Sequence, residues 1–175
     1  MADHRDSDDF YLMEPLQRAI FPIETFQPSR SMRKFAKKTS FRVTFNKDFP
    51  AIIEACAELR DETWISYGIQ WLYTVLHERN EAHSVEVWEG EQLVGGLYGV
   101  SQGGAFFGES MFSLRTNASK LALIYLIERL NSRGFILLDA QFMTDHLASL
   151  GAIEISRDEY RNRLQHALNI STTFS

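Results

Sequence analysis

The chain has 175 residues, a formal net charge of −5 and a hydrophobic content of 45%. That length suits one globular domain, and no apolar run reaches the roughly 18 residues of a membrane-spanning helix. The single cysteine, Cys56, excludes an intramolecular disulfide and suits a reducing, cytoplasmic compartment. The acidic start of the chain lacks the basic and then apolar layout of a signal peptide.

The first 28 residues are expected to form a polar and irregular segment. Residues 1–13 are mostly polar and charged, and residues 14–28 carry Pro15, Pro22 and Pro28 among apolar residues. Prolines at this density are typical of an irregular stretch on a domain surface. The folded domain is therefore predicted to comprise residues 29–175.

Positive charge is concentrated between residues 29 and 42, on a chain that is otherwise acidic. This stretch has no acidic residue and holds six basic residues, namely Arg30, Arg33, Lys34, Lys37, Lys38 and Arg42. A local basic surface on an acidic body suits contact with a phosphate backbone. The residues alone leave open the alternative of a solvated cationic turn or helix face.

The next elements are a strand and two helices. Alternation of apolar and polar residues predicts a half-buried strand over residues 41–46. Pro50 in a first turn predicts a helix to about residue 60. A second helix is predicted over residues 67–80, with a buried side made of Ile69, Leu72, Tyr73 and Leu76.

Three antiparallel strands are predicted over residues 84–89, 92–101 and 105–108, because glycine-containing turns separate them. A helix over residues 118–133 follows, with Asn117 as its N-cap and Gly134 as its stop. The remaining strand, helix, strand and helix are predicted over residues 135–142, 144–150, 151–155 and 156–168. Residues 171–175 are expected to fray. This order is typical of an α+β, acetyltransferase-like (GNAT-like) domain with a central, mostly antiparallel sheet flanked by helices.

Carboxylates interrupt two of the apolar strands. Asp139 and Gln141 are two residues apart, so strand alternation projects both to one face of the sheet. Strict alternation would send Phe106 and Glu109 to opposite faces of the sheet. Because Gly, Asp and Glu are disfavoured in strands, a functional site is expected here. The alternatives are an Asp139 that caps a loop and a Glu109 in a surface ion pair.

Six motifs in a fixed order carry a resemblance, namely HSVEVW, LVGGLYGV, FFGESMF, NASK, LLDAQ and HLASLGA. With SRSMR and TWI upstream, they resemble the conserved core of the leucyl/phenylalanyl-tRNA–protein transferases, from about residue 18 to residue 164. The resemblance implies transfer of leucine or phenylalanine from aminoacyl-tRNA to the N-terminal Arg or Lys of acceptor proteins, which tags them for N-end rule degradation. It makes residues 29–175 a GNAT-like aminoacyltransferase domain. This chemistry requires no cofactor and no metal.

The resemblance also implies residue roles. Asp139 and Gln141 would relay the proton from the attacking amine, and Glu109 would help to hold the cationic acceptor terminus. Trp64 would stack on the terminal adenosine of the tRNA, and the basic stretch would bind tRNA. The amino-acid pocket would be lined by Leu97, Phe106, Met111, Leu123 and Leu138, all of which could equally be ordinary core residues. Because the resemblance places both Phe106 and Glu109 at the site, Gly108 is predicted to supply a bulge that re-aims Glu109. Gly95, Gly96 and Gly99 are expected to allow close backbone approach to a ligand, with simple strand crossing as the alternative. His83 and His146 are expected to be structural residues in turns.

The chain is similar to an N-terminally shortened member of the family. The family has a Trp-Trp-Ser-Pro-Asp-Pro-Arg motif in a longer N-terminal portion, and residues 18–22 match only its tail. Aromatic residues of that portion contribute to the adenosine and amino-acid site, which bears on affinity for the aminoacyl-tRNA end. Two alternatives remain, a weakened paralogue that binds tRNA or basic N-termini, and a transferase with another amine acceptor. CoA is not expected, because residues 113–117 contain no glycine to cradle a pyrophosphate.

Overall fold

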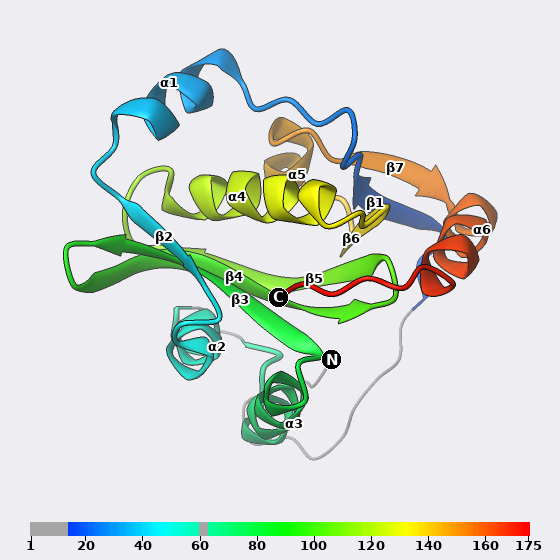
Figure 1. Ribbon diagram of the computed structural model, residues 1–175, viewed down its shortest axis with the longest axis horizontal. Helices are drawn as coiled ribbons and strands as arrows, with labels where there is room; N and C mark the ends of the chain where they lie inside the picture. Colours follow the sequence, from blue (N-terminus) through cyan, green and yellow to red (C-terminus); the bar gives the residue numbers. More distant parts are fainter. Residues whose placement is uncertain (1–13, 60–62) are drawn as a thin grey trace.

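The computed structural model describes residues 14–59 and 63–175, and its centre is a seven-stranded sheet (Figure 1). Strands β1 to β7 are Gln17–Phe21, Arg42–Phe45, Ala82–Glu89, Gln92–Gln102, Ala105–Ser113, Leu137–Gln141 and Ile153–Ser156. Their order across the sheet is β2-β3-β4-β5-β6-β1-β7. Within the described residues, β5 and β6 are the parallel pair and the other neighbours are antiparallel. This confirms a mixed fold of helices and a mostly antiparallel sheet.

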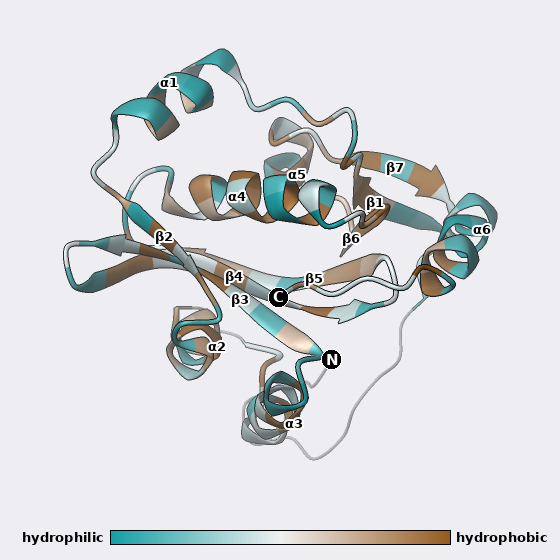
Figure 2. Ribbon diagram, in the orientation of Figure 1, coloured by the Kyte–Doolittle hydropathy of each residue, from teal (hydrophilic) through white to brown (hydrophobic). Residues whose placement is uncertain are grey.

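Helices cover both faces of the sheet. Helices α1 to α6 are Arg30–Lys38, Phe49–Glu58, Tyr67–Glu78, Ala118–Ser132, Asp145–Ser149 and Arg157–Leu168. Helix α4 crosses one face with α1 beyond it, whereas α2 and α3 lie on the other face (Figure 1). Helix α1 is largely hydrophilic (Figure 2), and its Ser29 hydroxyl accepts a hydrogen bond from the Met32 amide as an N-cap. None of the helices in the described part of the chain is long and apolar enough to cross a membrane.

The sheet separates two hydrophobic clusters. One lies under α4 and includes Leu97, Leu121 and Leu138, and the other lies under α2 and α3 and includes Ile52 and Tyr98. The glycines of β4 allow this packing, because side-chain carbons added to them would collide with protein atoms. Those atoms belong to Ala118 of α4, to Ile52 of α2 and to the Phe106 ring. The expectation that these glycines admit a ligand was therefore wrong.

Strand β1 corrects the expectation of an irregular segment over residues 14–28. Gln17–Phe21 lies between β6 and β7 and pairs with both in antiparallel register. The strand fits between Pro15 and Pro22, so neither proline has to donate a hydrogen bond within the ladder. Residues 1–13, which were expected to be polar and loosely attached, lie outside the described residues.

Several local expectations also differ from the structure. Leu72 was expected to be buried in the second helix, but it is 47% exposed. Asn117 has φ of 69° and makes no side-chain cap, and instead the Ser113 hydroxyl accepts a hydrogen bond from the Ser119 amide. The C-terminal stretch does not fray at Phe174, which is 1% exposed in the core. The Arg129 Nε donates a hydrogen bond of 2.7 Å to the Phe174 carbonyl.

Candidate active site

The parallel strands β5 and β6 separate after a short ladder, and a pocket opens where they diverge. Their pairing ends with Phe107 opposite Asp139, although β5 continues to Ser113. The cavity has a volume of about 210 Å³ and lies between β4, β5, β6, α4 and α5. We refer to it as the β5–β6 pocket. It combines an apolar wall with the Glu109 carboxylate, and Asp139, whose side chain is 0% exposed, also borders it.

The apolar wall contains four of the predicted pocket residues, namely Leu97, Met111, Leu123 and Leu138. Phe106 is fully buried beside Phe174 and is not among the lining residues. Phe21 of β1 and Leu126 of α4 also line the pocket. The sequence analysis did not select these two residues, because periodicity cannot separate pocket-lining positions from core positions.

Glu109 reaches the pocket through the predicted bulge. Tyr98 pairs with Ser110 and Gly99 pairs with Gly108, which leaves Glu109 as an extra residue in β5. A bulge turns the side chain of the inserted residue away from strict alternation. Glu109 therefore lines the pocket, and the structure confirms the bulge that was predicted from the family resemblance.

Gln141 and Tyr73 surround the Glu109 carboxylate. The Gln141 Nε2 donates hydrogen bonds of 3.2 Å to Glu109 Oε2 and to the Gly108 carbonyl, and the Tyr73 side chain is also hydrogen-bonded to Glu109. Burial raises the pKa of Glu109, although these two hydrogen bonds act against the rise. Glu109 is thus a carboxylate that titrates closer to neutrality than an exposed one.

Gln141 adopts a left-handed backbone conformation with φ of 66°. Such a conformation is strained for a residue other than glycine and persists only where surrounding contacts hold it. Here the Gln141 amide donates a hydrogen bond of 2.8 Å to Asp139 Oδ1. Strand alternation predicted that Asp139 and Gln141 lie on one face of the sheet. It did not predict the hydrogen bond from the Gln141 backbone to the Asp139 side chain.

Asp139 is fully buried and is held by two side chains that the sequence analysis missed. Arg18 of β1 donates from Nε to Oδ1 at 2.9 Å and from Nη2 to Oδ2 at 2.6 Å, and Tyr160 of α6 donates from its hydroxyl to Oδ2 at 2.8 Å. Burial acts against the charge of Arg18, but the hydrogen bond and charge of Asp139 outweigh it and raise the pKa of Arg18. A buried aspartate is costly unless it is paired or hydrogen-bonded, but the sequence did not indicate which side chains supply these contacts.

Trp64 and His83 lie away from the pocket wall, whereas His146 lines it. Trp64 packs partly buried against the cluster under α2 and α3, and it is not among the residues that line the pocket. His83 lies between the Asn46 amide and the Ser101 hydroxyl and stacks on Phe174, as expected of a structural residue. His146 lies in helix α5 rather than in a turn, and its structural role stays a prediction. No cluster of metal-ligating side chains occurs in residues 14–59 and 63–175.

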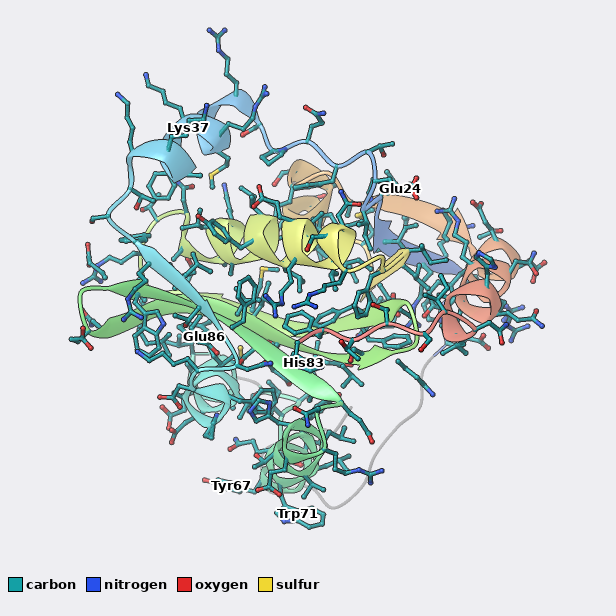
Figure 3. The ribbon with its side chains drawn as sticks, viewed as in Figure 1. Glu24, Lys37, Tyr67, Trp71, His83 and Glu86 are labelled. Atoms are coloured by element: carbon teal, nitrogen blue, oxygen red, sulfur yellow. The ribbon has the colours of Figure 1, made fainter. Side chains whose placement is uncertain are left out.

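The basic residues of α1 form an exposed surface beside the pocket. Arg30, Arg33, Lys34, Lys37 and Lys38 are exposed on this helix, and Arg42 is exposed on β2. Met32 and Leu123 line a small hollow between α1 and α4, and Leu123 also lines the β5–β6 pocket. Figure 3 shows Lys37 at the opposite end of the molecule from Tyr67 and Trp71 of α3. Helix α4 thus lies between the hollow beside α1 and the β5–β6 pocket.

Comparison with known proteins gives weak structural likenesses. A conserved protein of unknown function from Staphylococcus epidermidis has a TM-score of 0.49 and 8% identity, over 80% of this chain and 57% of its own. The structure of L-PGS from Bacillus licheniformis gives a TM-score of 0.48 and 15% identity, over 76% of this chain and 50% of its own. Neither likeness supports an argument about function.

Sequence comparison is decisive. The family model described as leucyl/phenylalanyl-tRNA protein transferase matches residues 20–165. A relative from Roseobacter denitrificans is 54% identical over 95% of this chain and 79% of its own length, and one from Maricaulis maris is 53% identical over 100% and 82%. Both relatives are named leucyl/phenylalanyl-tRNA–protein transferase. The chain therefore belongs to the leucyl/phenylalanyl-tRNA–protein transferase family of aminoacyltransferases.

Proposed function

We propose that this chain transfers leucine or phenylalanine from aminoacyl-tRNA to proteins that begin with Arg or Lys. The observation that carries the proposal is one pocket in which an apolar wall lies beside Glu109, whose carboxylate accepts a hydrogen bond from Gln141. An apolar side chain can enter the wall while a cationic amine meets the carboxylate. The element order and sheet support a GNAT-like domain, which we extend to include β1. The lone cysteine, which forms no disulfide, suits action in the cytoplasm.

The reaction balances without a redox step. The α-amine of the acceptor protein loses a proton and attacks the ester carbonyl of the aminoacyl-tRNA. A carbon–nitrogen bond forms, the carbon–oxygen bond to the ribose breaks, and the ribose oxygen takes up a proton. Because the ester is already activated, the site has to position two substrates and transfer one proton.

Glu109 is suited both to attract the acceptor and to take its proton. Burial raises the pKa of Glu109, and a raised pKa makes this carboxylate a stronger general base toward the α-ammonium of the acceptor. While ionised, the same carboxylate offers a charge-assisted hydrogen bond to a cationic N-terminus. Asp139 has no exposed surface, so it acts on the reaction through Gln141.

The apolar wall determines which amino acid is accepted. Leu97, Met111, Leu123 and Leu138 surround a cavity of about 210 Å³. An apolar pocket distinguishes side chains by only about 1–3 kcal/mol per methylene. We therefore expect Leu and Phe both to be accepted, and small or polar side chains to be transferred slowly.

The basic surface of α1 is proposed to bind the tRNA backbone, with Arg42 of β2 extending it. Lys and Arg contacts to phosphates release counterions, so binding weakens linearly on a logarithmic salt scale. Trp64 is proposed to stack on the terminal adenosine, which is a contact of about 1–3 kcal/mol per base.

The test is transfer of labelled leucine from leucyl-tRNA to peptides beginning with Arg, Lys or Ala. Glu109→Gln keeps the size of the side chain and is expected to lower the rate with Arg and Lys peptides about 100-fold. Glu128→Gln, at an exposed position of α4, serves as the matched control and should retain the wild-type rate. Equal transfer to all three peptides would refute the proposed acceptor class. Absence of transfer with intact tRNA binding would favour a binding module.

A further inference from the structure

We propose that Arg18 and Tyr160 are positioning residues of this transferase, which hold Asp139 so that it fixes the conformation of Gln141 beside Glu109. This inference rests on the proposed function, in which Gln141 and Glu109 meet the acceptor amine. It assigns Asp139 to the support of the site, and it makes β1 and α6 parts of that support.

The hydrogen-bonding capacity of Asp139 is already in use. Oδ1 accepts hydrogen bonds from Arg18 Nε and the Gln141 amide, and Oδ2 accepts from Arg18 Nη2 and the Tyr160 hydroxyl. An ionised carboxylate offers about four acceptor positions, so these four donors fill it. The Asp139 side chain is 0% exposed. A substrate proton therefore has no vacant position on this carboxylate.

One of the four hydrogen bonds connects Asp139 to Gln141, which in turn contacts Glu109 of the pocket. The backbone N–H of Gln141 donates to Asp139, and the Gln141 backbone has a left-handed conformation. From this conformation, the side-chain Nε2 reaches both the Gly108 carbonyl and Glu109 Oε2. A shift of Asp139 would thus be passed to Gln141 and from there to Glu109.

Arg18 supplies a geometry that Lys cannot reproduce. Its guanidinium makes two parallel bonds to the Asp139 carboxylate and also lies 4.7 Å from the centre of the Tyr160 ring. A planar fork is suited to such two-point contact and stacking, whereas an ammonium is a point charge. We call Arg18, Asp139 and Tyr160 together the clamp. It joins β1 to β6 across 121 residues of sequence and β6 to α6 across 21 residues.

The test compares Arg18→Met, Arg18→Lys and Tyr160→Phe in the leucine transfer assay. Arg18→Met is expected to lower kcat about 100-fold, because small misplacements of reacting groups have effects of this size, while KM for leucyl-tRNA changes less than about threefold. Arg18→Lys should recover part of the loss, and Tyr160→Phe should cost less than Arg18→Met. The matched control is Arg161→Met on α6, whose ion pair with Glu14 is exposed, and it should leave kcat unchanged.

The pH profile separates positioning from general support of the fold. Without its cation, the buried Asp139 carboxylate is expected to take up a proton and so to lose its hold on the Gln141 amide. The acid limb of the profile should then move to higher pH in Arg18→Met and return toward the wild-type limb in Arg18→Lys. A structural role alone would lower the amount of folded enzyme without moving this limb.

The wild-type rate tests the proposed function, and the ratio of each variant to wild type tests the clamp. An Arg18→Met enzyme with wild-type kcat and an unmoved acid limb would overturn the inference, even if transfer to Arg peptides is established. If wild type uses another amine, the ratios are measured with that amine. If Arg18→Met does not fold, the Arg18→Lys and Tyr160→Phe profiles decide, because both variants keep most of the packing.

Discussion

Asp139 and Glu86 are two buried carboxylates with different consequences. Both are 0% exposed, and each accepts four hydrogen bonds. Glu86 receives them from uncharged donors, namely the Thr44 and Ser84 hydroxyls and the Lys47 and Asp48 amides. These donors belong to β2, to the β2–α2 connection and to β3 itself, and none of them lines the β5–β6 pocket. Burial of a carboxylate thus does not indicate an active site, but a contact that leads to a pocket does.

The largest expected effect is that of Asp139→Asn. The variant leaves Arg18 without its counter-ion. It also replaces one carboxylate oxygen with an amide nitrogen, which cannot accept the hydrogen bonds that this oxygen accepts now. Loss of one partner of a buried pair is expected to lower the free energy of unfolding by about 3–5 kcal/mol, and misplacement of Gln141 should lower kcat about 100-fold. Urea unfolding and the transfer assay measure the two effects. Unchanged kcat in the folded variant would show that Asp139, like Glu86, supports only the fold and not the reaction.

Acidification should destabilise the region around Glu86, which also contains His83. Burial lowers the pKa of His83 to about 4, with His77 and Arg129 contributing. The folded-state pKa lies below that of the unfolded chain, so this contribution to stability is complete above about pH 6.5 and is lost as the pH falls toward 4. The loss amounts to roughly 3 kcal/mol.

Urea unfolding of wild type and His83→Gln at pH 7 and pH 5 measures this contribution. The variant is expected to lose less stability on acidification than wild type does. Parallel losses in both proteins would show that other groups cause the acid sensitivity of the fold.

Glu86→Gln sharpens the comparison because it retains size and removes charge. The amide nitrogen cannot accept the hydrogen bonds that one carboxylate oxygen accepts now, so at least one buried donor loses its partner. We expect the free energy of unfolding to fall by about 1–3 kcal/mol, with kcat of the folded enzyme within twofold of wild type. A large fall in kcat would mean that Glu86 is coupled to the reaction after all.

The smallest effect is expected from Thr44→Val. The Thr44 hydroxyl donates to Glu86 Oε2 and accepts from the Trp88 indole. A substitution of similar shape that removes these two bonds should cost about 1–2 kcal/mol of unfolding free energy and leave transfer unchanged. Tyr160→Phe, its counterpart at Asp139, removes one hydroxyl and should alter the pH profile as well. Calorimetry and the transfer assay together distinguish the two.

Local patterns predicted the parts of the fold whose partners are close in the sequence. The β3–β4–β5 meander was predicted because short turns join its strands, and the Glu109 bulge followed from the conflict between alternation and the site. Four residues of the pocket wall followed from the family resemblance. These predictions required no knowledge of distant contacts.

Long-range contacts account for what the sequence did not indicate. Strand β1 was missed because its partners β6 and β7 lie far along the chain and prolines flank it. Arg18 and Tyr160 were missed for the same reason, since neither carries a local signal of its bond to Asp139. Phe174 was expected to fray because the terminal residues are polar, although the single aromatic ring among them fills the core.

The position of β1 between β6 and β7 has a consequence for the order in which parts of the enzyme fold. Synthesis delivers Arg18 first, and Asp139 is added 121 residues later. Contacts of such sequence separation form late and slowly, and domains assemble as their segments leave the ribosome. The hairpins of the meander can form while the chain is still growing, but the clamp cannot. If Arg18 positions Asp139 as proposed, a nascent chain is therefore expected to become active only after Asp139 and its partner strands have been made.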